Sequence, residues 1–463
     1  MRSRPLRNFE AAVPLLVFAL VWPTPAQGQC EPGWSPLGSG LELQQGGLIS
    51  DMAVFDDGSG PALYIAGGGF SVNGVPGHYI AKWDGFEWST VGGGTDGWTL
   101  VVTTYDDGSG EALYAFGSFT SAGGLPARRA ARWDGFGWNP LGEGLIRGKV
   151  PYLYVATVFD DGTGRGLYVG GGISEAGGVS VSGIAKWDGV RWSDVGGGVT
   201  GSLSAVGGLA VFDDGSGPAL YAGGHFTWAG GVPARNIAKW DGNRWWPLGD
   251  GVSAGSVIPY LQALTMFDDG SGPALFAGGS FSQPVHFMAC WDGRSWSAVG
   301  EPLNQRVQVL HSFDDGRGPM LYAGGRFVRA GTLRVNLVAR WDGAAWSNLG
   351  AGLGDARAGV FGVTTYDDGT GPGLFFGGNF QTAGNFAVPG VAKWGCVRGD
   401  LNCDGVLNGG DIDPFFLALS DPAAYQTAFP SCNIQLGDMN GDRRVNAADI
   451  DPFFICLGRG ACP

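Results

Sequence analysis

The chain has 463 residues, of which 44% are hydrophobic, so it is long enough for two or three domains with buried cores. Its 87 glycines show no Gly-X-Y period, which excludes collagen, and its 18 tryptophans argue against disorder. The formal net charge of -14 opposes contact with phosphate backbones, so no nucleic-acid partner is expected.

Residues 1–28 have the pattern of a secretory signal peptide. Arg2, Arg4 and Arg7 give a basic start, an apolar run covers residues 13–22, and small residues follow at 24–26. The apolar run is too short to span a bilayer as a helix, and no later run reaches that length. We therefore expect an exported protein, secreted or associated with the cell surface, without a membrane span.

Residues 29–396 contain seven copies of one pattern. Each copy has Asp-Asp-Gly, then Leu-Tyr or Leu-Phe with glycines, then a Trp-bearing segment such as Ala-Lys-Trp-Asp-Gly. Turn signals between these apolar runs predict four short strands per copy. A four-stranded repeat of about 50 residues is typical of a propeller blade, so we expect an all-β, seven-bladed β-propeller. The repeats are marked by Asp56, Asp106, Asp160, Asp213, Asp268, Asp314 and Asp367.

The two ends of this region complement each other. The last copy stops at Gly395-Cys396 without a fourth strand, whereas residues 33–38 match the fourth strand of another copy at 137–142. The N-terminal strand should therefore complete blade seven, which removes exposed sheet edges. Cys30 then precedes the closing strand and Cys396 follows its partner strand, so we predict a Cys30–Cys396 disulfide.

The blade pattern resembles that of the kelch family. The resemblance lies in a Gly-Gly doublet at the end of the second strand, followed by two tryptophans, as in Gly67-Gly68, Trp83 and Trp88. It covers about residues 34–395. It implies a kelch-like propeller and implies no particular activity.

Residues 397–463 differ in composition and hold two segments of one spacing. The segments run from Asp400 to Asp411 and from Asp438 to Asp449, with oxygen-bearing side chains at positions 1, 3, 5, 9 and 12. Calcium takes roughly six to eight oxygen ligands, which such a loop supplies together with the position-7 carbonyl. Each loop runs into Ile-Asp-Pro-Phe-Phe, where Pro suits a first helical turn. We expect a small helical, EF-hand-like module that binds Ca²⁺.

This pair of loops resembles a type I dockerin over about residues 399–457, which implies a cohesin-like partner. Position 12 is Asp rather than the Glu of EF-hands, and Arg443 replaces the position-6 glycine, so we expect weaker binding in the second loop. The resemblance implies ligands at Asp400, Asn402, Asp404, Asn408 and Asp411 with the Val406 carbonyl, and at Asp438, Asn440, Asp442, Asn446 and Asp449 with the Arg444 carbonyl.

Seven cysteines in an exported chain favour disulfides, and the odd count leaves at least one unpaired within the chain. The four in the tail allow three pairings, of which we favour Cys403–Cys432 and Cys456–Cys462 because each closes a local loop. Cys290 stands where other copies have Lys or Arg before Trp, and we expect a buried free thiol.

Function on a propeller is expected where the copies differ. His225 follows the Gly-Gly of one copy, and Trp98, Trp228 and Trp246 lie outside the repeat. Exposed aromatic side chains can stack on sugar rings, and they can equally pack within loops. These four residues are therefore candidate ligand contacts.

No nucleophile elbow, phosphate loop or zinc spacing occurs, and no catalytic residue is assigned. The Asp-Asp-Gly segments could hold metal, but they are more simply explained as hairpin turns in which Asp bonds its own backbone. We expect a secreted binding or scaffold protein whose propeller presents a glycan- or protein-binding surface. A polysaccharide hydrolase or lyase with a dockerin tail is the alternative, and a purely structural repeat is a third.

Overall fold

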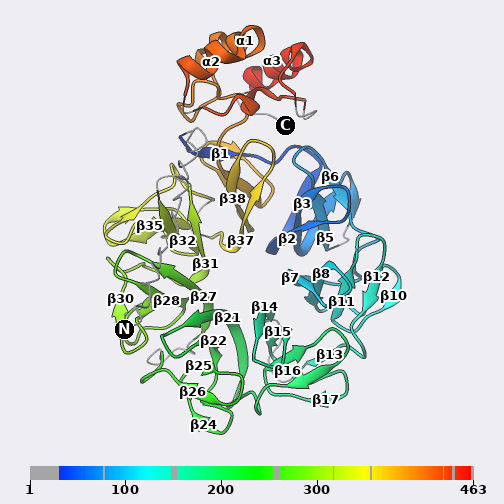
Figure 1. Cartoon of the computed structure of the whole chain (residues 1–463), viewed down its shortest axis with the longest axis vertical. Coiled ribbons are helices and arrows are strands. Elements are labelled where there is room, and N and C mark those ends of the chain that lie inside the picture. Colours follow the sequence, from blue (N-terminus) through cyan, green and yellow to red (C-terminus); the bar gives the residue numbers. More distant parts are fainter. Residues whose placement is uncertain are drawn as a thin grey trace, which may run out of the picture.

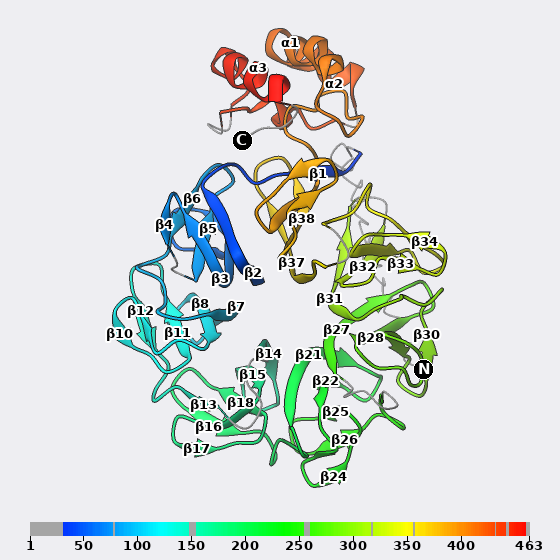
Figure 2. The same cartoon turned by 180° about the vertical axis from the view of Figure 1, so that it is seen from behind.

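The computed structural model describes residues 31–76, 79–147, 154–253, 260–315, 318–354, 357–430, 432–440 and 444–459. These residues form a ring of antiparallel sheets with a small helical module at one side of the ring (Figures 1 and 2). The predicted signal peptide lies outside the described residues. Among the residues described, no helix has both the length and the apolar character needed to cross a bilayer.

Each copy of the repeat folds into a four-stranded sheet, here called a blade, with its first strand innermost in the ring (Figure 1). Blades one to four consist of β2 (Leu41–Asp56), β3 (Pro61–Val72), β5 (Ile80–Trp83) and β6 (Trp88–Thr90); β7 (Thr99–Asp106), β8 (Glu111–Gly117), β11 (Ala130–Trp133) and β12 (Trp138–Pro140); β14 (Tyr154–Asp160), β15 (Arg165–Gly171), β18 (Ile184–Trp187) and β19 (Trp192–Asp194); and β21 (Ala205–Asp213), β22 (Pro218–His225), β25 (Ile237–Trp240) and β26 (Trp245–Pro247).

Three further sheets continue the ring in chain order. Blades five to seven consist of β27 (Leu261–Asp268), β28 (Pro273–Gly279), β29 (Met288–Trp291) and β30 (Trp296–Ala298); β31 (Val307–Asp314), β32 (Pro319–Gly325), β35 (Val338–Trp341) and β36 (Trp346–Ser347); and β37 (Val360–Asp367), β38 (Pro372–Gly378), β41 (Val391–Gly395) and β1 (Gly33–Ser35).

Short strands lie between the second and third strands of most blades and pair into small sheets, which β13 and β20 join from the segments before blades three and four. They are β4 (Val75–Pro76), which pairs with β3; β9 (Ser121–Ala122) with β10 (Leu125–Pro126); β16 (Ile173–Ala176) with β13 (Leu145–Arg147) and β17 (Val179–Ser180); β23 (Trp228–Ala229) with β20 (Val199–Thr200) and β24 (Val232–Pro233); β33 (Arg329–Ala330) with β34 (Leu333–Arg334); and β39 (Thr382–Ala383) with β40 (Phe386–Ala387).

Ring closure follows the prediction from the chain ends. β1 pairs antiparallel with β41, with Trp34 opposite Trp394. The strand that begins the described chain is therefore the fourth strand of the last blade. Cys396 is disulfide-bonded, and its predicted partner Cys30 lies outside the described residues, so this pairing stays a prediction.

Paired tryptophans hold neighbouring blades together. Trp83 and Trp88 face each other across β5 and β6 with ring centroids 5.2 Å apart, and both are buried. The Trp88 indole N–H donates to the Leu37 carbonyl of the preceding blade at 2.9 Å, a bond worth about 1 kcal/mol net. The equivalent donor–acceptor pairs are Trp138–Val91, Trp192–Leu141, Trp245–Val195, Trp296–Leu248, Trp346–Val299 and Trp34–Leu349.

The Asp-Asp-Gly segments are hairpin turns, as interpreted from the sequence. In the first turn, Asp56 Oδ1 accepts from the backbone N–H groups of Gly58 at 2.8 Å and Gly60 at 3.0 Å. These glycines have φ of 94° and 115°, where a Cβ would be strained. Because the carboxylate satisfies the turn backbone, the residue pattern is explained by local geometry.

The helical module contains two similar halves. The 3₁₀ turn η1 (Gly409–Asp411) leads into α1 (Ile412–Ser420), and η3 (Ala447–Asp449) leads into α3 (Ile450–Arg459). Between them lie α2 (Pro422–Ala428) and η2 (Ile434–Gly437). Phe415 of α1 stacks on Phe453 of α3 with ring centroids 4.1 Å apart.

One disulfide of the module joins Cys403 to Cys432, the pairing favoured from loop length. Cys456 is also disulfide-bonded, and its predicted partner Cys462 lies outside the described residues. Cys290 in β29 is a free, half-buried cysteine.

Arg398 ties the module to the ring. Its guanidinium donates to the Asp368 carbonyl of blade seven at 3.1 Å and to the Asp438 carbonyl of the second loop at 2.9 Å. It also lies over the Phe86 ring of blade one, 4.3 Å from the centroid. The second loop therefore begins at a residue anchored to the ring.

Candidate functional site

The innermost strands of six blades each contain a β-bulge near their start. Their register against the second strand shifts there, as between Leu261 and Ala263 in β27 and between Val307 and Val309 in β31. A bulge leaves one extra residue out of the ladder and redirects its side chain. The extra residues all line one cavity at the ring axis and are Ser50, Leu100, Gly207, Gln262, Gln308 and Phe361.

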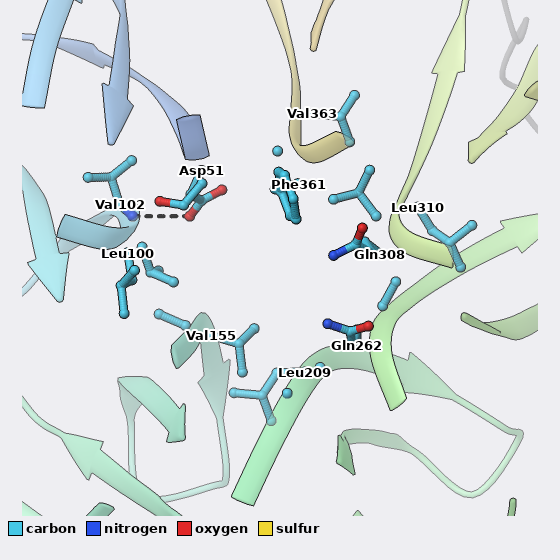
Figure 3. A pocket seen from close by; sticks show the side chains of 18 of the residues that line it. Asp51, Leu100, Val102, Val155, Leu209, Gln262, Gln308, Leu310, Phe361 and Val363 are labelled. Carbon is cyan, nitrogen blue, oxygen red and sulfur yellow. Dashed lines mark hydrogen bonds between the residues drawn. The ribbon is translucent and has the colours of Figure 1, made fainter. Parts of the chain in front are cut away.

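The axial cavity has a volume of about 830 Å³, within the usual range for a small-molecule site. Leucine and valine side chains supply most of its wall. Gln262 and Gln308 extend toward the centre from one side, and Asp51 lies across from them (Figure 3). A few polar groups in an otherwise apolar wall can fix the orientation of a ligand.

Asp51 is held by backbone donors of two blades. Its Oδ1 accepts from the Met52 N–H at 2.9 Å, and its Oδ2 accepts from the Val102 N–H at 3.0 Å. Burial raises the pKa of Asp51 to about 7, which outweighs the opposing effect of these two hydrogen bonds. The described residues that line the cavity include no Lys, Arg or His to pair with the carboxylate, so no opposite charge there counteracts the effect of burial on its pKa.

Gln308 offers an acceptor without a protein partner. Its Oε1 is buried and receives no hydrogen bond from the residues described. Ser50, by contrast, donates its hydroxyl to the carbonyls of Ala66 at 3.2 Å and Thr99 at 3.1 Å. This oxygen is closed to solvent, and a buried unpaired acceptor of this kind costs the fold roughly 1–3 kcal/mol.

The structure does not bring the four predicted ligand contacts together. Trp98 lines the axial cavity. His225 instead bonds through Nδ1 with the Leu203 carbonyl at 2.8 Å and stacks on Tyr260. Neither it nor the two tryptophans of blade four is among the residues that line the cavity.

Trp228 and Trp246 lie on the outer part of blade four and are 45% and 40% exposed. Arg244 covers the Trp246 ring at 3.7 Å, and the Trp246 indole donates to Asp241 Oδ2 at 2.7 Å. One face of this ring is thus already occupied, which reduces its suitability for stacking on a sugar.

Sequence reasoning missed Asp51, Gln262, Gln308 and Phe361. A signal was present, because each bulge residue stands six positions before the first Asp of its turn. At that position the copies differ in size and polarity.

The first tail loop gathers the predicted calcium ligands. The Asp404 N–H donates to Asp400 Oδ1 at 3.1 Å and to Asn402 Oδ1 at 3.0 Å. The Asn408 amide donates to the Val406 carbonyl at 3.0 Å. These contacts link positions 1, 3 and 5 of the loop to one another, and position 9 to position 7.

Position 12 has the same backbone role in both loops. Asp411 accepts from the N–H groups of Leu401 at 2.8 Å, Asn402 at 3.1 Å and Asn408 at 2.8 Å. Asp449 accepts from the equivalent groups of Met439, Asn440 and Asn446 at 2.8, 3.0 and 2.8 Å. Asp442 of the second loop lies outside the described residues.

The electrostatics of the first loop suit a cation. Asp400 and Asp411 are fully buried by protein. Burial raises the pKa of Asp400 to about 6, with a further contribution from the charges of Asp411 and Asp404, and burial also raises the pKa of Asp411. A divalent cation would offset this cost.

Carboxylates alone do not complete a metal site in this loop. Within the described part of the chain, no group of three or more His, Cys, Asp or Glu side chains is placed to hold a metal ion. The loop also depends on two asparagine oxygens and one carbonyl, Asn402, Asn408 and Val406. Such mixed oxygen ligands are typical of calcium loops.

Comparison with solved structures finds distant likenesses, among them the following two. The extracellular domain of a hybrid two component system from B. thetaiotaomicron is 11% identical over 76% of this chain and 39% of its own length, with a TM-score of 0.44. The GH74 enzyme of Niastella koreensis is 16% identical over 66% of this chain and 47% of its own, with a TM-score of 0.37. The chain thus spans less than half of either structure. No family model and no curated protein matches it.

Proposed function

We propose that the protein is a secreted glycan-binding protein built on a kelch-like, seven-bladed propeller, and that the axial cavity is its binding site. The observation that carries the proposal is the set of six bulges that direct unlike side chains into one cavity of about 830 Å³. The shared residues of the repeat hold the ring, and the bulge residues are free to vary.

The polar groups of the cavity match a hydroxyl-rich ligand. A sugar hydroxyl can accept from the side-chain amides of Gln262 and Gln308, while Phe361 offers an apolar face. The leucine and valine side chains lower the local polarity of the cavity, which makes an unpaired polar group there costly. A ligand that satisfies these groups is therefore selected over one that lacks the hydroxyls.

Binding is favoured over polysaccharide hydrolysis. Glycoside hydrolysis generally needs two carboxyl groups on either side of the scissile bond. Among the described residues that line the cavity, Asp51 is the one carboxyl group, and both of its oxygens accept backbone hydrogen bonds. The described lining of the cavity thus lacks the second carboxyl that this chemistry requires.

A glycan array probed with the full chain tests this function. We expect binding to a restricted class of neutral glycans that a Gln308→Leu variant no longer shows. Absence of binding above background across the array would contradict the glycan assignment, and release of reducing sugar in a parallel assay would contradict the non-enzymatic one.

For the tail we propose a dockerin-like role, calcium-dependent attachment to a cohesin-like protein. Support comes from the hydrogen bonds that link the predicted ligands of the first loop, from the matching Asp411 and Asp449 geometry, and from the paired helices α1 and α3. Calcium, when bound, would cross-link the loop ligands and fix the angle at which each helix leaves its loop. Arg398 would then hold the module at a set position on the ring.

Attachment is tested with an immobilised type I cohesin. We expect the full chain to bind in calcium and to elute in EDTA, and Asp400→Asn to weaken binding while Asp413→Asn, an exposed site outside the loop, does not. Binding that persists unchanged in EDTA would contradict the calcium role. No binding in calcium would contradict the partner.

A further inference from the structure

The second Asp of each turn marks a cation site that recurs around the ring. In blade one, Lys82 Nζ lies 2.7 Å from Asp57 Oδ2 and donates to Ser59 Oγ at 2.6 Å, while the Tyr64 hydroxyl donates to Asp57 Oδ2 at 2.8 Å. Lys82 stands directly opposite Tyr64 in the sheet. The turn, the second strand and the third strand of one blade together hold one ammonium group.

Five other blades place a cation in the same position. In blade three the ammonium of Lys186 has three acceptors, Asp161 Oδ1 at 2.8 Å, Thr163 Oγ1 at 2.8 Å and the Gly164 carbonyl at 3.2 Å. Three acceptors match the three N–H donors of an ammonium. The remaining pairs are Lys239–Asp214, Lys393–Asp368, Arg132–Asp107 and Arg340–Asp315.

Blade five has the acceptors without the cation. Cys290 stands opposite Phe276, the register that Lys82 and Tyr64 have in blade one. Asp269 Oδ1 accepts from the N–H of Ser271 at 3.1 Å and from its hydroxyl at 2.6 Å. In the described part of the chain, no residue donates to Asp269 Oδ2. In blade one, the equivalent oxygen, Asp57 Oδ2, accepts hydrogen bonds from Lys82 and Tyr64.

A cavity of about 260 Å³ lies where the lysine is missing. Asp269, Ser271, Gly272, Cys290 and Asp292 line it, and its described lining includes no Lys, Arg or His. Asp292 is engaged by its own turn, since its Oδ1 accepts from the N–H groups of residues 294 and 295 at 2.7 Å each. The free carboxylate oxygen therefore belongs to Asp269.

We propose that this blade-five cavity binds a primary ammonium group from outside, with Asp269, Ser271 and the Gly272 carbonyl as its acceptors. The ammonium could belong to a small free amine or to a lysine side chain of a partner protein. In six blades of the same ring, the equivalent turn acceptors already hold a Lys or Arg side chain. Among the blades described, blade five is the one in which this cation position is empty.

A metal ion fits this cavity less well. Burial, followed by the charge of Asp269, raises the pKa of Cys290 to about 11, so the sulfur is a neutral thiol rather than a thiolate ligand. Cys290, Asp269 and Asp292 also do not form a group placed to hold a metal, within the residues described. Ammonium, with N–H donors, suits the hydroxyl and carbonyl acceptors better.

Titration of the full chain with propylammonium tests the site, with tetramethylammonium as a cation that has no N–H donor. We expect saturable binding of propylammonium alone. Cys290→Lys should fill the cavity from within and weaken binding at least tenfold, whereas Cys290→Ala should leave affinity within about threefold. Equal binding to wild type and Cys290→Lys, or equal binding of the two cations, would overturn the proposal.

The same cavity can be built in blade one as a positive control. The double change Lys82→Cys and Tyr64→Phe reproduces the blade-five residues and should raise the stoichiometry from one propylammonium per chain to two. A stoichiometry that stays at one in a folded variant would contradict the geometric argument. If Nα-acetyl-lysine methylamide binds with an affinity similar to that of propylammonium, the ammonium group comes from a lysine of a partner protein. If it does not bind, the ammonium group comes from a small free amine.

Discussion

The ring and the tail use repetition in opposite ways. In the ring, the residues that all copies share hold the structure, as when Trp88 and its counterparts bond the preceding blade. The residues that differ face the axial cavity or, in blade five, leave a cation site open. In the tail, the shared residues of the two loops both shape the backbone and form the predicted metal site.

This difference explains where chemistry can be found in each region. A position that must bond a neighbouring blade cannot also change to suit a ligand, so the binding proposed for the ring is assigned to bulge residues outside the ladder. A calcium loop has one inorganic ligand in every copy, so its site residues can stay identical. The sequence repeats therefore indicate the predicted calcium loops of the tail, but they do not indicate the proposed axial binding site of the ring.

The largest expected effect tests the shared residues of the ring. Trp34 is 5% exposed and donates to the Leu349 carbonyl of blade six at 2.8 Å, and its strand completes blade seven. Trp34→Ala should lower the free energy of unfolding by about 3–5 kcal/mol, as for other buried aromatic truncations. Urea denaturation followed by far-UV circular dichroism measures the change.

Trp246→Ala is the matched control, because Trp246 is 40% exposed. We expect a change within about 0.5 kcal/mol, as for most exposed positions. Similar losses for Trp34 and Trp246 would mean that the strand at the chain start does not close the ring in solution.

Calcium removal tests the shared residues of the tail. If calcium is present at 100 to 1,000 times its dissociation constant, its removal should cost the module about 3–4 kcal/mol. Scanning calorimetry of the full chain with and without EDTA should show the tail transition move to lower temperature while the ring transition stays. An unchanged tail transition would contradict the dockerin-like assignment.

A smaller effect, visible as a pH dependence, tests one residue of the axial cavity. The pKa of Asp51 rises from 3.8 to about 7 on folding, so the folded protein holds this proton more tightly than the unfolded chain. Stability should therefore fall as pH rises from about 4 to about 7. Asp51→Asn cannot titrate and should flatten this part of the stability curve, whereas an unchanged slope would place the pKa of Asp51 near its ordinary value.

Acidic turns supply the opposite dependence at lower pH. The pKa of Asp57 and of Asp214 is lowered to about 2; burial opposes this shift, and the lysines Lys82 and Lys239 are the largest cause of it. Their stabilising contribution is present above about pH 4 and is lost as pH falls toward 2. The effect of Asp51 on the pH dependence of stability should therefore be measured only above pH 4.

Much of the fold was predictable from the sequence because the repeat is regular. The four strands of each copy, the pairing of β1 with β41, the turn at Asp56 and the Cys403–Cys432 disulfide all follow from local pattern and chain-end matching. The axial site was not predicted, because a β-bulge at Gln262 or Gln308 has no distinct residue type. The shared position of these residues, six before each turn, can be recognised as a bulge once the registers of the neighbouring strands are known.

The predicted ligand contacts show the same limit. Trp98 does line the cavity, yet Trp228 and Trp246 share its residue type and lie on the outer part of blade four. Residue type alone does not tell whether a tryptophan lies in an exposed outer loop or at the ring axis. The three-dimensional position decides which tryptophan meets a ligand.

The most direct test compares glycan binding by two double variants of the full chain. One carries Gln262→Leu and Gln308→Leu in the axial cavity, and the other carries Trp228→Ala and Trp246→Ala on blade four. If the differing bulge residues form the binding site, the first variant loses at least tenfold in affinity for the glycan that wild type binds, and the second stays within about twofold. Loss of binding in the second variant, with the first unchanged, would place the site on the outside of the ring and contradict the account.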